Sequence, residues 1–219
     1  MKKIVVTGAQ SGLGLSLAEI YKKLGNTVIA LCLECTAELS ALSVHVHENT
    51  DVTDASGLLK IANQYQGEYF DVLINNAGIM VNDDLNNLSL TEVQRQYNVN
   101  AIGPLNVTNA FRKNFRAGSK LVNISSRLGS ISDNSSGGDI GYRMSKAAQN
   151  MLTTNLAIAL RGEKVVVVAL HPGIVATGMT KGNGSPSLEV AQDLKLVIDD
   201  LNLDNTGKFF DRNGAEIPW

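Results

Sequence analysis

The sequence has no dense run of lysine or arginine, and its 219 residues carry a formal net charge of −2 at pH 7. Nucleic acids and anionic membranes attract clustered positive charge, so neither is an expected partner. The chain also has no uninterrupted apolar run near the roughly 20 residues that span a bilayer. The start at Met1-Lys2-Lys3 leads into too few apolar residues for a signal peptide. We therefore expect a cytoplasmic protein with a small-molecule partner.

Cysteine and histidine are also scarce. Cys32 and Cys35 form one Cys-x-x-Cys pair, but a structural zinc site needs four ligands and no second pair completes it. A redox pair usually lies at a helix start, whereas this pair follows an apolar run. His45 and His47 alternate around Val46, as same-face residues of a strand do. The sequence therefore predicts no metal site.

The chain is long enough to bury one core, because 44% of its residues are hydrophobic. We find no linker or internal repeat, so we expect a single domain over residues 1–219. Short apolar runs predict strands at residues 2–7, 27–33, 42–46, 71–74, 120–124, 164–170 and 206–211. Helical patterns separate most of them, and this alternation predicts a doubly wound parallel sheet. The expected fold is α/β of the Rossmann type, with a seven-stranded parallel sheet flanked by helices on both faces.

A glycine-rich turn joins the first expected strand to the first helix. After Thr7, residues 8–14 read Gly-Ala-Gln-Ser-Gly-Leu-Gly. Glycines let the backbone turn sharply and approach a ligand, while the N-terminus of the following helix offers free N–H groups to a phosphate. The spacing differs from both the G-x-G-x-x-G fingerprint and the P-loop, and a turn without a ligand is the alternative. The turn is a candidate pyrophosphate cradle.

Polar and glycine residues follow several other expected strands. They are Asp51-Val52, the segment 75–78, Ser125-Ser126 and the segment 171–177. The ligand crevice of a doubly wound sheet lies at the carboxyl ends of its strands. We therefore expect these residues to line one rim together with the glycine turn.

The sequence predicts a long helix in the middle of the chain and another near its C-terminus. Ser89 and Glu92 form a capping box that opens a helix to about residue 115. Pro104 should bend this helix, as either a functional break or a packing kink. Near the C-terminus, a polar segment leads to Pro186 at the first turn of another helix. We expect a substrate lid at residues 178–201.

Tyr142 and Lys146 lie four residues apart in an expected helix at 142–160, and this spacing puts them on one face. A nearby ammonium favours the phenolate, and bringing a phenol to neutrality takes roughly 3–4 kcal/mol. Such a phenol can exchange a proton with an alcohol or a carbonyl. Ser126, at the rim, can donate a hydrogen bond to a substrate oxygen. A tyrosine–lysine pair alone also occurs by chance, so the neighbouring motifs decide.

Together these motifs resemble the short-chain dehydrogenase/reductase family over essentially the whole chain. The matching motifs are Thr7-Gly8-x-x-x-Gly12-x-Gly14, Asn75-Asn76-Ala77-Gly78, Asn100, Asn123-Ile124-Ser125-Ser126, Tyr142-x-x-x-Lys146 and Pro172-Gly173. Residues 127–130 and 207–219 look most like the compact branch of C-factor-like and sniffer-like carbonyl reductases.

The resemblance implies a catalytic tetrad of Asn100, Ser126, Tyr142 and Lys146. Tyr142 would exchange the proton, Ser126 would orient the substrate oxygen, and Asn100 would anchor a water. Lys146 would lower the tyrosine pKa and hold the nicotinamide ribose. The gap between Ser126 and Tyr142 is a few residues longer than is typical of the family, which leaves the serine assignment less direct than that of the tyrosine.

The resemblance also implies NAD(H) or NADP(H) as the cofactor, which supplies the hydride. The implied cofactor-binding residues are Gly8, Gln10, Ser11, Gly12, Leu13, Gly14, Leu33, Asp51, Val52, Asn76, Ala77, Gly78, Tyr142, Lys146, Pro172, Gly173, Val175 and Thr177. At the positions that select the cofactor stand Cys32, Leu33 and Ser11, and none of them is a cation for a 2′-phosphate. Glu34, one position later, could bond a ribose hydroxyl. These residues favour NAD(H), whereas the branch resemblance implies NADP(H).

The leading hypothesis is thus an NAD(P)-dependent oxidoreductase that interconverts a carbonyl and an alcohol. The alternative is a cofactor-binding signalling or interaction protein on the same fold, because fold alone does not fix function. Such a protein would gain nothing from keeping Tyr142 and Lys146 on one face. A methyltransferase on a similar sheet would leave the tetrad unexplained. The helices at 89–115 and 142–160 correspond to the usual dimer surface of the family, which implies a homodimer or homotetramer.

Overall fold

The computed structural model describes all residues from Met1 to Trp219. The main sheet contains β1 (Lys3–Thr7), β2 (Thr27–Leu31), β3 (His45–His47), β4 (Val72–Asn75), β5 (Lys120–Ile124), β6 (Val166–His171) and β9 (Phe209–Asp211). The α-helices are α1 (Gly12–Lys23), α2 (Ala37–Ala41), α3 (Ala55–Ala62), α4 (Leu90–Tyr97), α5 (Gly103–Phe111), α6 (Ile140–Ala159) and α7 (Ser187–Asp200). None of the helices combines the length and the apolar character needed to cross a membrane.

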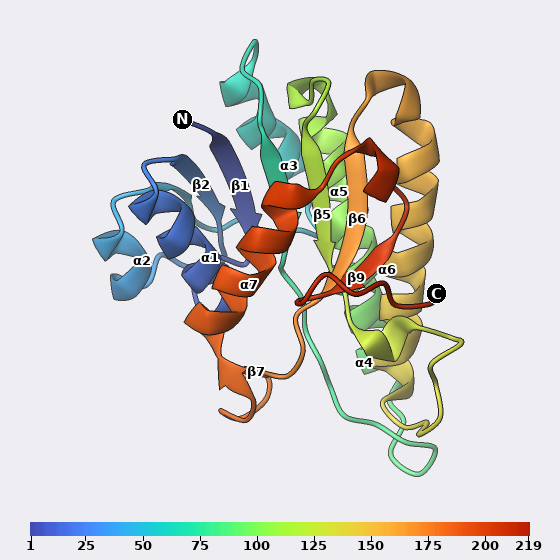
Figure 1. The fold of residues 1–219 in the computed structure, drawn as a ribbon. Coiled ribbons are helices and arrows are strands. Elements are labelled where there is room, and N and C mark those ends of the chain that lie inside the picture. The colour runs from blue at the N-terminus through green and yellow to red at the C-terminus, as the bar shows by residue number, and fades with distance from the viewer.

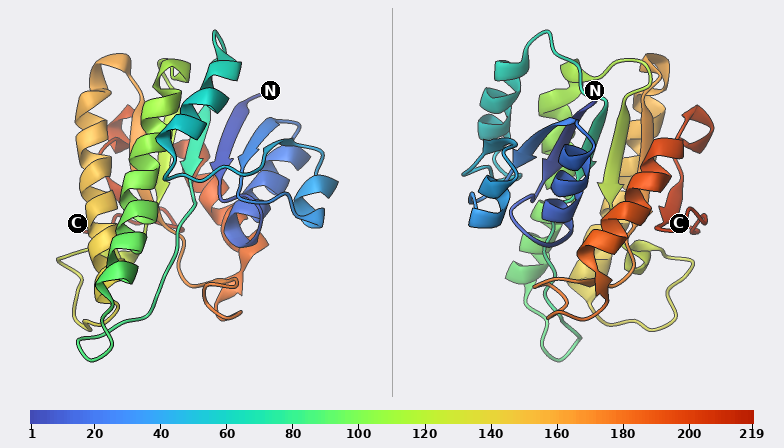
Figure 2. Two further views of the ribbon diagram at one scale, coloured as in Figure 1. Left: turned by 180° about the vertical axis from the view of Figure 1, so that it is seen from behind. Right: turned by 60° about the vertical axis from the view of Figure 1, so that its left-hand side comes forward.

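The seven strands are all parallel and lie in the order β3-β2-β1-β4-β5-β6-β9. The chain starts at β1 in the middle, builds outward to β3, and then returns past β1 to build the other half. Helices α1 and α7 cover one face, and α3, α5 and α6 cover the other (Figures 1 and 2). The expected α/β fold with a seven-stranded parallel sheet flanked on both faces is confirmed.

The strand residues alternate between two cores, as the pleat of a sheet requires. Ile4 and Val6 of β1 point into the core that α1 and α7 cover, whereas Val5 between them points into the core under α3, α5 and α6. All three side chains are fully buried. Each strand thus needs apolar residues on both faces, and this explains its short continuous apolar run in the sequence.

The third strand begins later than its apolar run suggests. We expected it at residues 42–46, but β3 spans His45–His47. Ser43 adopts a left-handed conformation with φ of 51°, and Leu42 and Ser43 form the turn that ends α2. Within β3, His47 is hydrogen-bonded through Nε2 to the Tyr65 hydroxyl at 2.7 Å. Both histidines are therefore strand residues, as the alternating pattern predicted.

The long helix expected at residues 89–115 is divided in the structure. The Ser89 side chain accepts a hydrogen bond from Glu92 N, as a cap should. Between α4 and α5 the helix widens into a π-helical turn at Asn98–Ile102, immediately before Pro104. The wider turn accommodates Pro104, which has no N–H to donate and would clash with a regular upstream carbonyl. The break expected at the proline is thus a π-helical turn, and it contains Asn100.

The segment expected to be a lid has two different environments. Helix α7 packs against α1, and its Val190, Ala191, Leu194 and Ile198 are fully buried. The helix is therefore part of the core. The preceding residues 177–184 lie between the short strands β7 (Val175–Ala176) and β8 (Ser185–Pro186), away from the main sheet (Figure 1). Of the expected lid at 178–201, α7 thus lies in the core, whereas residues 178–184 lie outside it.

Candidate active site

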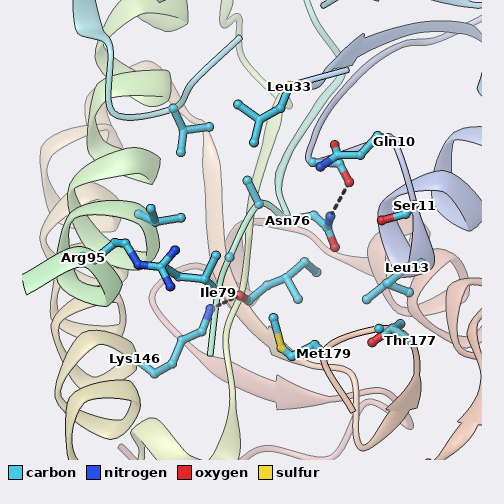
Figure 3. Close-up of a pocket in the computed structure, with 18 of the residues that line it drawn as sticks. Gln10, Ser11, Leu13, Leu33, Asn76, Ile79, Arg95, Lys146, Thr177 and Met179 are labelled. Atoms are coloured by element: carbon cyan, nitrogen blue, oxygen red, sulfur yellow. Dashed lines mark hydrogen bonds between the residues drawn. The ribbon is translucent and has the colours of Figure 1, made fainter. Parts of the chain in front are cut away.

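A cavity of about 1090 Å³ opens at the carboxyl ends of the strands. Its walls come from the glycine turn, the ends of β2 and β4, helix α4, Lys146 of α6 and the segment 172–180 (Figure 3). Of the residues expected to bind a cofactor, those that line it are Gly8, Gln10, Ser11, Gly12, Leu13, Leu33, Asp51, Val52, Asn76, Ala77, Gly78, Lys146, Pro172, Gly173, Val175 and Thr177. Gly14 and Tyr142 are not among the lining residues. The rim expected from the sequence is therefore a single concave site.

The glycines of the turn are required by close backbone packing. Gly8 has φ of 66°, and a Cβ there would lie 2.9 Å from the Ala77 Cα. A Cβ on Gly14 would lie 2.2 Å from the Gly8 carbonyl oxygen, well inside contact distance. Gly14 thus lets α1 start directly against the turn. Its role is in packing, which is why it does not reach the cavity surface.

The side chains of Thr7, at the end of β1, and Asn76, directly after β4, fix the glycine turn to the sheet. The Thr7 hydroxyl oxygen accepts hydrogen bonds from Asn76 N and Ala77 N, both at 3.0 Å. The Asn76 amide donates to the Thr7 carbonyl at 3.0 Å and to the Gly8 carbonyl at 3.3 Å. These hydrogen bonds connect the carboxyl ends of β1 and β4, so the glycine turn is preorganised before any ligand binds.

The residues of this cradle fit a dinucleotide pyrophosphate. Ser11 is the N-cap of α1, and its side chain makes no capping hydrogen bond, so the N–H groups of the first turn have no side-chain partner. The Gln10 Oε1 atom is buried without a hydrogen-bond partner. Gln10 and Ser11 both line the cavity (Figure 3). The turn therefore presents free backbone donors to a ligand phosphate.

Asn100 of the π-helical turn is fully buried and holds three parts of the site together. Its Oδ1 accepts from Ile79 N at 2.8 Å, and its Nδ2 donates to Ile79 O at 2.8 Å and to the Ser145 hydroxyl at 2.9 Å. Ser145 in turn donates to the Tyr142 carbonyl at 2.7 Å. Both amide hydrogens are used, so only oxygen acceptors of Asn100 remain for a water.

Tyr142 lies on the first turns of α6 and is 7% exposed. Burial raises the pKa of its phenol to about 12, a hydrogen bond with the Ser126 side chain lowers it in part, and the Asp139 carboxylate raises it. Ser126 is also nearly buried, and its hydroxyl caps the short 3-10 turn at Arg127–Gly129. The structure thus brings the expected serine and tyrosine into contact.

Lys146 lies 4% exposed beneath the Tyr142 ring, with Nζ 5.8 Å from the ring centroid. Its Nζ donates to the Ile124 carbonyl at 2.9 Å and to Gln149 Oε1 at 2.8 Å. Burial lowers the pKa of Lys146 to about 7. The structure differs here from the expectation that Lys146 lowers the phenol pKa. Burial is the largest influence on both groups, and it shifts both toward their neutral forms.

Gly78 and Gly129 let the elements of this cluster pack closely. A Cβ on Gly78 would lie 3.2 Å from Asn100 Oδ1 and 3.7 Å from Lys146 Nζ. A Cβ on Gly129 would lie 2.7 Å from the Lys146 carbonyl carbon. The segments after β4 and β5 therefore lie directly against the Asn100 and Lys146 side of the site. The four expected catalytic residues form one cluster at the edge of the cavity, although only Lys146 lines it.

The structure adds residues that the sequence did not single out. The Asp83 carboxylate accepts hydrogen bonds from Gly141 N at the start of α6. Arg95 points from α4 into the cavity and is paired with Glu92 at 2.8 Å (Figure 3). No sequence signal identifies Asp83, because its loop has no regular pattern. The sequence did contain a signal for Gln149, because it lies three residues after Lys146 on the same face of the expected helix.

Known proteins resemble this chain over most of its length. A family model described as short chain dehydrogenase matches residues 2–187. The 1-hydroxy-2-glutathionyl-2-methyl-3-butene dehydrogenase of Rhodococcus sp. (strain AD45) is 34% identical over 226 residues and covers 100% of both chains. C-signal of Myxococcus xanthus is 40% identical over 153 residues, which cover 68% of this chain and 92% of that protein.

Among solved structures, the carbonyl reductase Sniffer of D. melanogaster has a TM-score of 0.93 with 26% identity, and the match covers 100% of both chains. The NADPH-bound carbonyl reductase from chicken fatty liver has a TM-score of 0.89 with 29% identity, covering 100% of this chain and 99% of that one. The resemblance to the branch with C-signal and the sniffer-like carbonyl reductases is confirmed. The chain is thus an oxidoreductase of the short-chain dehydrogenase/reductase family.

Proposed function

We propose that this oxidoreductase interconverts a carbonyl and an alcohol on a small molecule, with a nicotinamide dinucleotide in the cavity and Tyr142 as the acid/base. One observation supports this proposal. Asn100, Ser126, Tyr142 and Lys146 form a buried cluster at the edge of the cavity, and the glycine turn lines the same cavity. The whole chain, residues 1–219, would act as one binding and catalytic domain.

In this mechanism the glycine turn and the N-terminus of α1 bind the pyrophosphate, and the bound cofactor supplies or accepts a hydride at the substrate carbon. During reduction, Tyr142 donates its hydroxyl proton to the substrate oxygen, and the raised phenol pKa keeps that proton in place at neutral pH. Ser126 contacts the phenol and orients the same oxygen. Lys146 holds the nicotinamide ribose, and Asn100 keeps a water through an oxygen acceptor.

The choice between the two dinucleotides rests on the residues around the adenosine ribose. The chicken carbonyl reductase was solved with NADPH. In this chain, Leu33 and Ser11 line the corresponding part of the cavity, and neither carries a positive charge for a 2′-phosphate. The cations that line the cavity are Lys146 and Arg95, and Arg95 is already paired with Glu92. We therefore propose NAD(H) as the preferred cofactor.

One experiment tests both proposals. The purified protein is titrated with NADH and with NADPH by fluorescence, and then assayed with the tighter-binding one against a panel of aldehydes and ketones. We expect tighter binding of NADH, and cofactor oxidation with at least one carbonyl. Binding of neither dinucleotide at millimolar concentration would refute the proposed site, and tighter binding of NADPH would refute only the cofactor preference.

A second candidate function comes from the C-signal of Myxococcus xanthus, which is 40% identical over 68% of this chain. A signalling protein of this fold would bind the dinucleotide without reducing a carbonyl. It would predict tight cofactor binding and no turnover with any member of the panel. Turnover that depends on Tyr142 argues against it.

We also propose that the protein is a homodimer or a homotetramer. Met144, Met151 and Ile158 form a stripe of exposed apolar side chains along α6 at seven-residue spacing, and they are 56%, 62% and 65% exposed. Helices α4 and α5 lie beside α6 (Figure 2), and Tyr97 on α4 and Leu105 on α5 add exposed apolar side chains. Neighbouring helices with exposed apolar side chains suit a second copy of the same surface.

The segment at residues 177–186 is the proposed lid. Its residues 177–180 line the cavity, opposite the wall formed by α4 (Figure 3). The Thr180 hydroxyl donates to the Val175 carbonyl at 2.5 Å, which anchors the start of the segment. Closure of this segment would exclude water from the substrate and the nicotinamide.

A further inference from the structure

Gln149 is a buried polar residue next to the proposed catalytic lysine. It lies on α6 three residues after Lys146 and is completely buried. Its Oε1 accepts the hydrogen bond from Lys146 Nζ at 2.8 Å, while its Nε2 has no hydrogen-bond partner. An apolar side chain at this position would fill the same space without burying an unpaired amide. The packing of α6 therefore does not explain a glutamine here, whereas its contact with Lys146 does.

The two acceptors around Lys146 limit how the ammonium can act. A protonated lysine has three N–H donors. One points to the Ile124 carbonyl and a second to Gln149 Oε1, so one donor remains for a ligand in the cavity that Lys146 lines. Without Gln149, the ammonium would keep only one fixed partner. Gln149 thus determines both the direction and the number of the free donors.

Few titratable groups surround Lys146, so the dipole of the Gln149 amide is one of the main electrostatic influences on its charge. Tyr142 lies on the same helix and faces Lys146 with its ring. Arg95 of α4 is the other cation that lines the cavity. Arg127 lies on the 3-10 turn that packs against α6 and is paired with Asp133 at 2.8 Å. No carboxylate forms an ion pair with Lys146, so neutral acceptors alone stabilise its charged form.

We propose that Gln149 is a positioning residue that holds Lys146 for cofactor binding and sets its proton affinity. This inference rests on the proposed role of Lys146 in the reaction. The amide oxygen stabilises the ammonium more than the neutral amine, because a hydrogen bond to a charged donor is the stronger one. A change at residue 149 should therefore shift the titration of Lys146 in a direction set by the charge of the new side chain.

The test measures the titration of Lys146 directly by NMR of lysine labelled with 13C at Cε, on the full chain without substrate or cofactor. Because burial lowers its pKa to about 7, Lys146 should titrate apart from the exposed lysines, and Lys146→Arg identifies its signal. Gln149→Glu places a carboxylate at the same distance and should raise the titration midpoint by about one pH unit or more. Gln149→Leu removes the acceptor and should lower the midpoint.

The matched control is Thr153→Val, one turn further along α6. Thr153 is fully buried, accepts a hydrogen bond from the Asn123 amide and donates one to the Gln149 backbone carbonyl, but it forms no hydrogen bond with Lys146 or with the Gln149 side chain. The Thr153→Val substitution should destabilise the fold without moving the titration midpoint of Lys146. Opposite shifts in the glutamate and leucine variants support the proposal. Equal midpoints in all variants, or shifts in the same direction, would overturn it, and the glutamate variant still decides if the leucine variant does not fold.

Two further measurements separate this inference from the proposed function. NADH affinity should fall about tenfold in Gln149→Leu, because the lysine loses its fixed direction. The pH profile of kcat should shift in the same direction as the NMR midpoint in each variant. If the midpoints shift but the wild-type protein reduces no carbonyl, the inference stands and the proposed function fails. If the protein reduces a carbonyl but the midpoints do not move, the proposed function stands and the inference about Gln149 fails.

Discussion

The Asp83 carboxylate accepts hydrogen bonds from the backbone N–H of Gly141, with Oδ2 at 3.1 Å and Oδ1 at 3.3 Å. Gly141 lies in the first turn of α6 and immediately precedes Tyr142. The carboxylate thus satisfies a free N–H group and faces the positive end of the helix dipole. The loop after β4 thereby fixes the point at which the tyrosine enters the site.

Replacement of Asp83 by alanine should therefore loosen this helix start. We expect a loss of about 1–2 kcal/mol in the free energy of unfolding, as for other lost helix caps. We also expect kcat to fall about tenfold with little change in cofactor affinity, because Tyr142 is displaced while the cradle is untouched. Urea unfolding and steady-state kinetics measure both effects.

Asp84→Ala is the control for this variant, because Asp84 is exposed and its carboxylate bonds only within its own loop, to Asn86 N and Asn87 N. It should leave kcat near the wild-type value. Equal effects of the two substitutions would mean that the loop as a whole, and not the contact with Gly141, supports the tyrosine.

Replacement of Gly14 by alanine should disrupt the glycine turn. The added Cβ would lie 2.2 Å from the Gly8 carbonyl oxygen, so α1 or the turn must move. We expect dinucleotide affinity to fall at least tenfold, together with a loss of several degrees in Tm. Gly25→Ala is the matched control, since Gly25 has φ of 76° but no atom within 4 Å of the new Cβ. It should cost only about 1 kcal/mol of backbone strain and leave cofactor binding unchanged.

The buried Lys146 should make stability depend on pH. Burial lowers its pKa from the ordinary 10.5 to about 7, so between these values the unfolded chain binds more protons than the folded protein. The free energy of unfolding should then rise with pH across this window, at up to about 1.4 kcal/mol per pH unit. Below pH 7 both states are protonated, and the contribution of Lys146 is constant.

The measurement is urea unfolding between pH 6 and pH 10 for the wild-type protein and for Lys146→Met. Subtracting the two curves removes the contributions of other titrating groups. We expect the difference to change in favour of the wild-type protein as the pH rises above 7. Parallel curves over the whole range would show that Lys146 keeps an ordinary pKa in the folded protein.

The apolar stripe on α6 allows a test of the proposed oligomer. Met151→Glu puts a charge at the centre of this stripe, and we expect light scattering to show a monomer at micromolar concentration. Leu59→Glu on α3 is the control, because Leu59 is 52% exposed but lies on another helix. A wild-type mass equal to that of one chain would contradict the proposal at once.

The sequence was sufficient to predict the features that depend on local pattern. The apolar runs identified all seven strands, and the four-residue spacing placed Tyr142 and Lys146 on one helix face. The start of β3 was missed, because a left-handed serine at residue 43 extends the turn after α2 and has no distinctive signature. The π-helical turn at Asn98–Ile102 was expected only as a bend, since a proline indicates a break but not its geometry.

Properties that depend on distant parts of the chain could not be predicted in the same way. The lid was expected to include α7, because its amphipathic pattern does not reveal that it packs on α1. The pKa of Tyr142 depends on burial by segments far along the chain, and spacing to Lys146 alone suggested the opposite direction of shift. The contact between Asp83 and Gly141 joins residues 58 positions apart and has no local motif.

The central claim is that the Tyr142 hydroxyl transfers the proton. Its most direct test is the turnover of Tyr142→Phe beside the wild-type protein, with saturating dinucleotide and the best carbonyl of the panel. We expect kcat to fall by about 10²–10⁴ while fluorescence titration gives the same cofactor affinity, because only the hydroxyl is removed. Undiminished turnover in the phenylalanine variant would contradict the account.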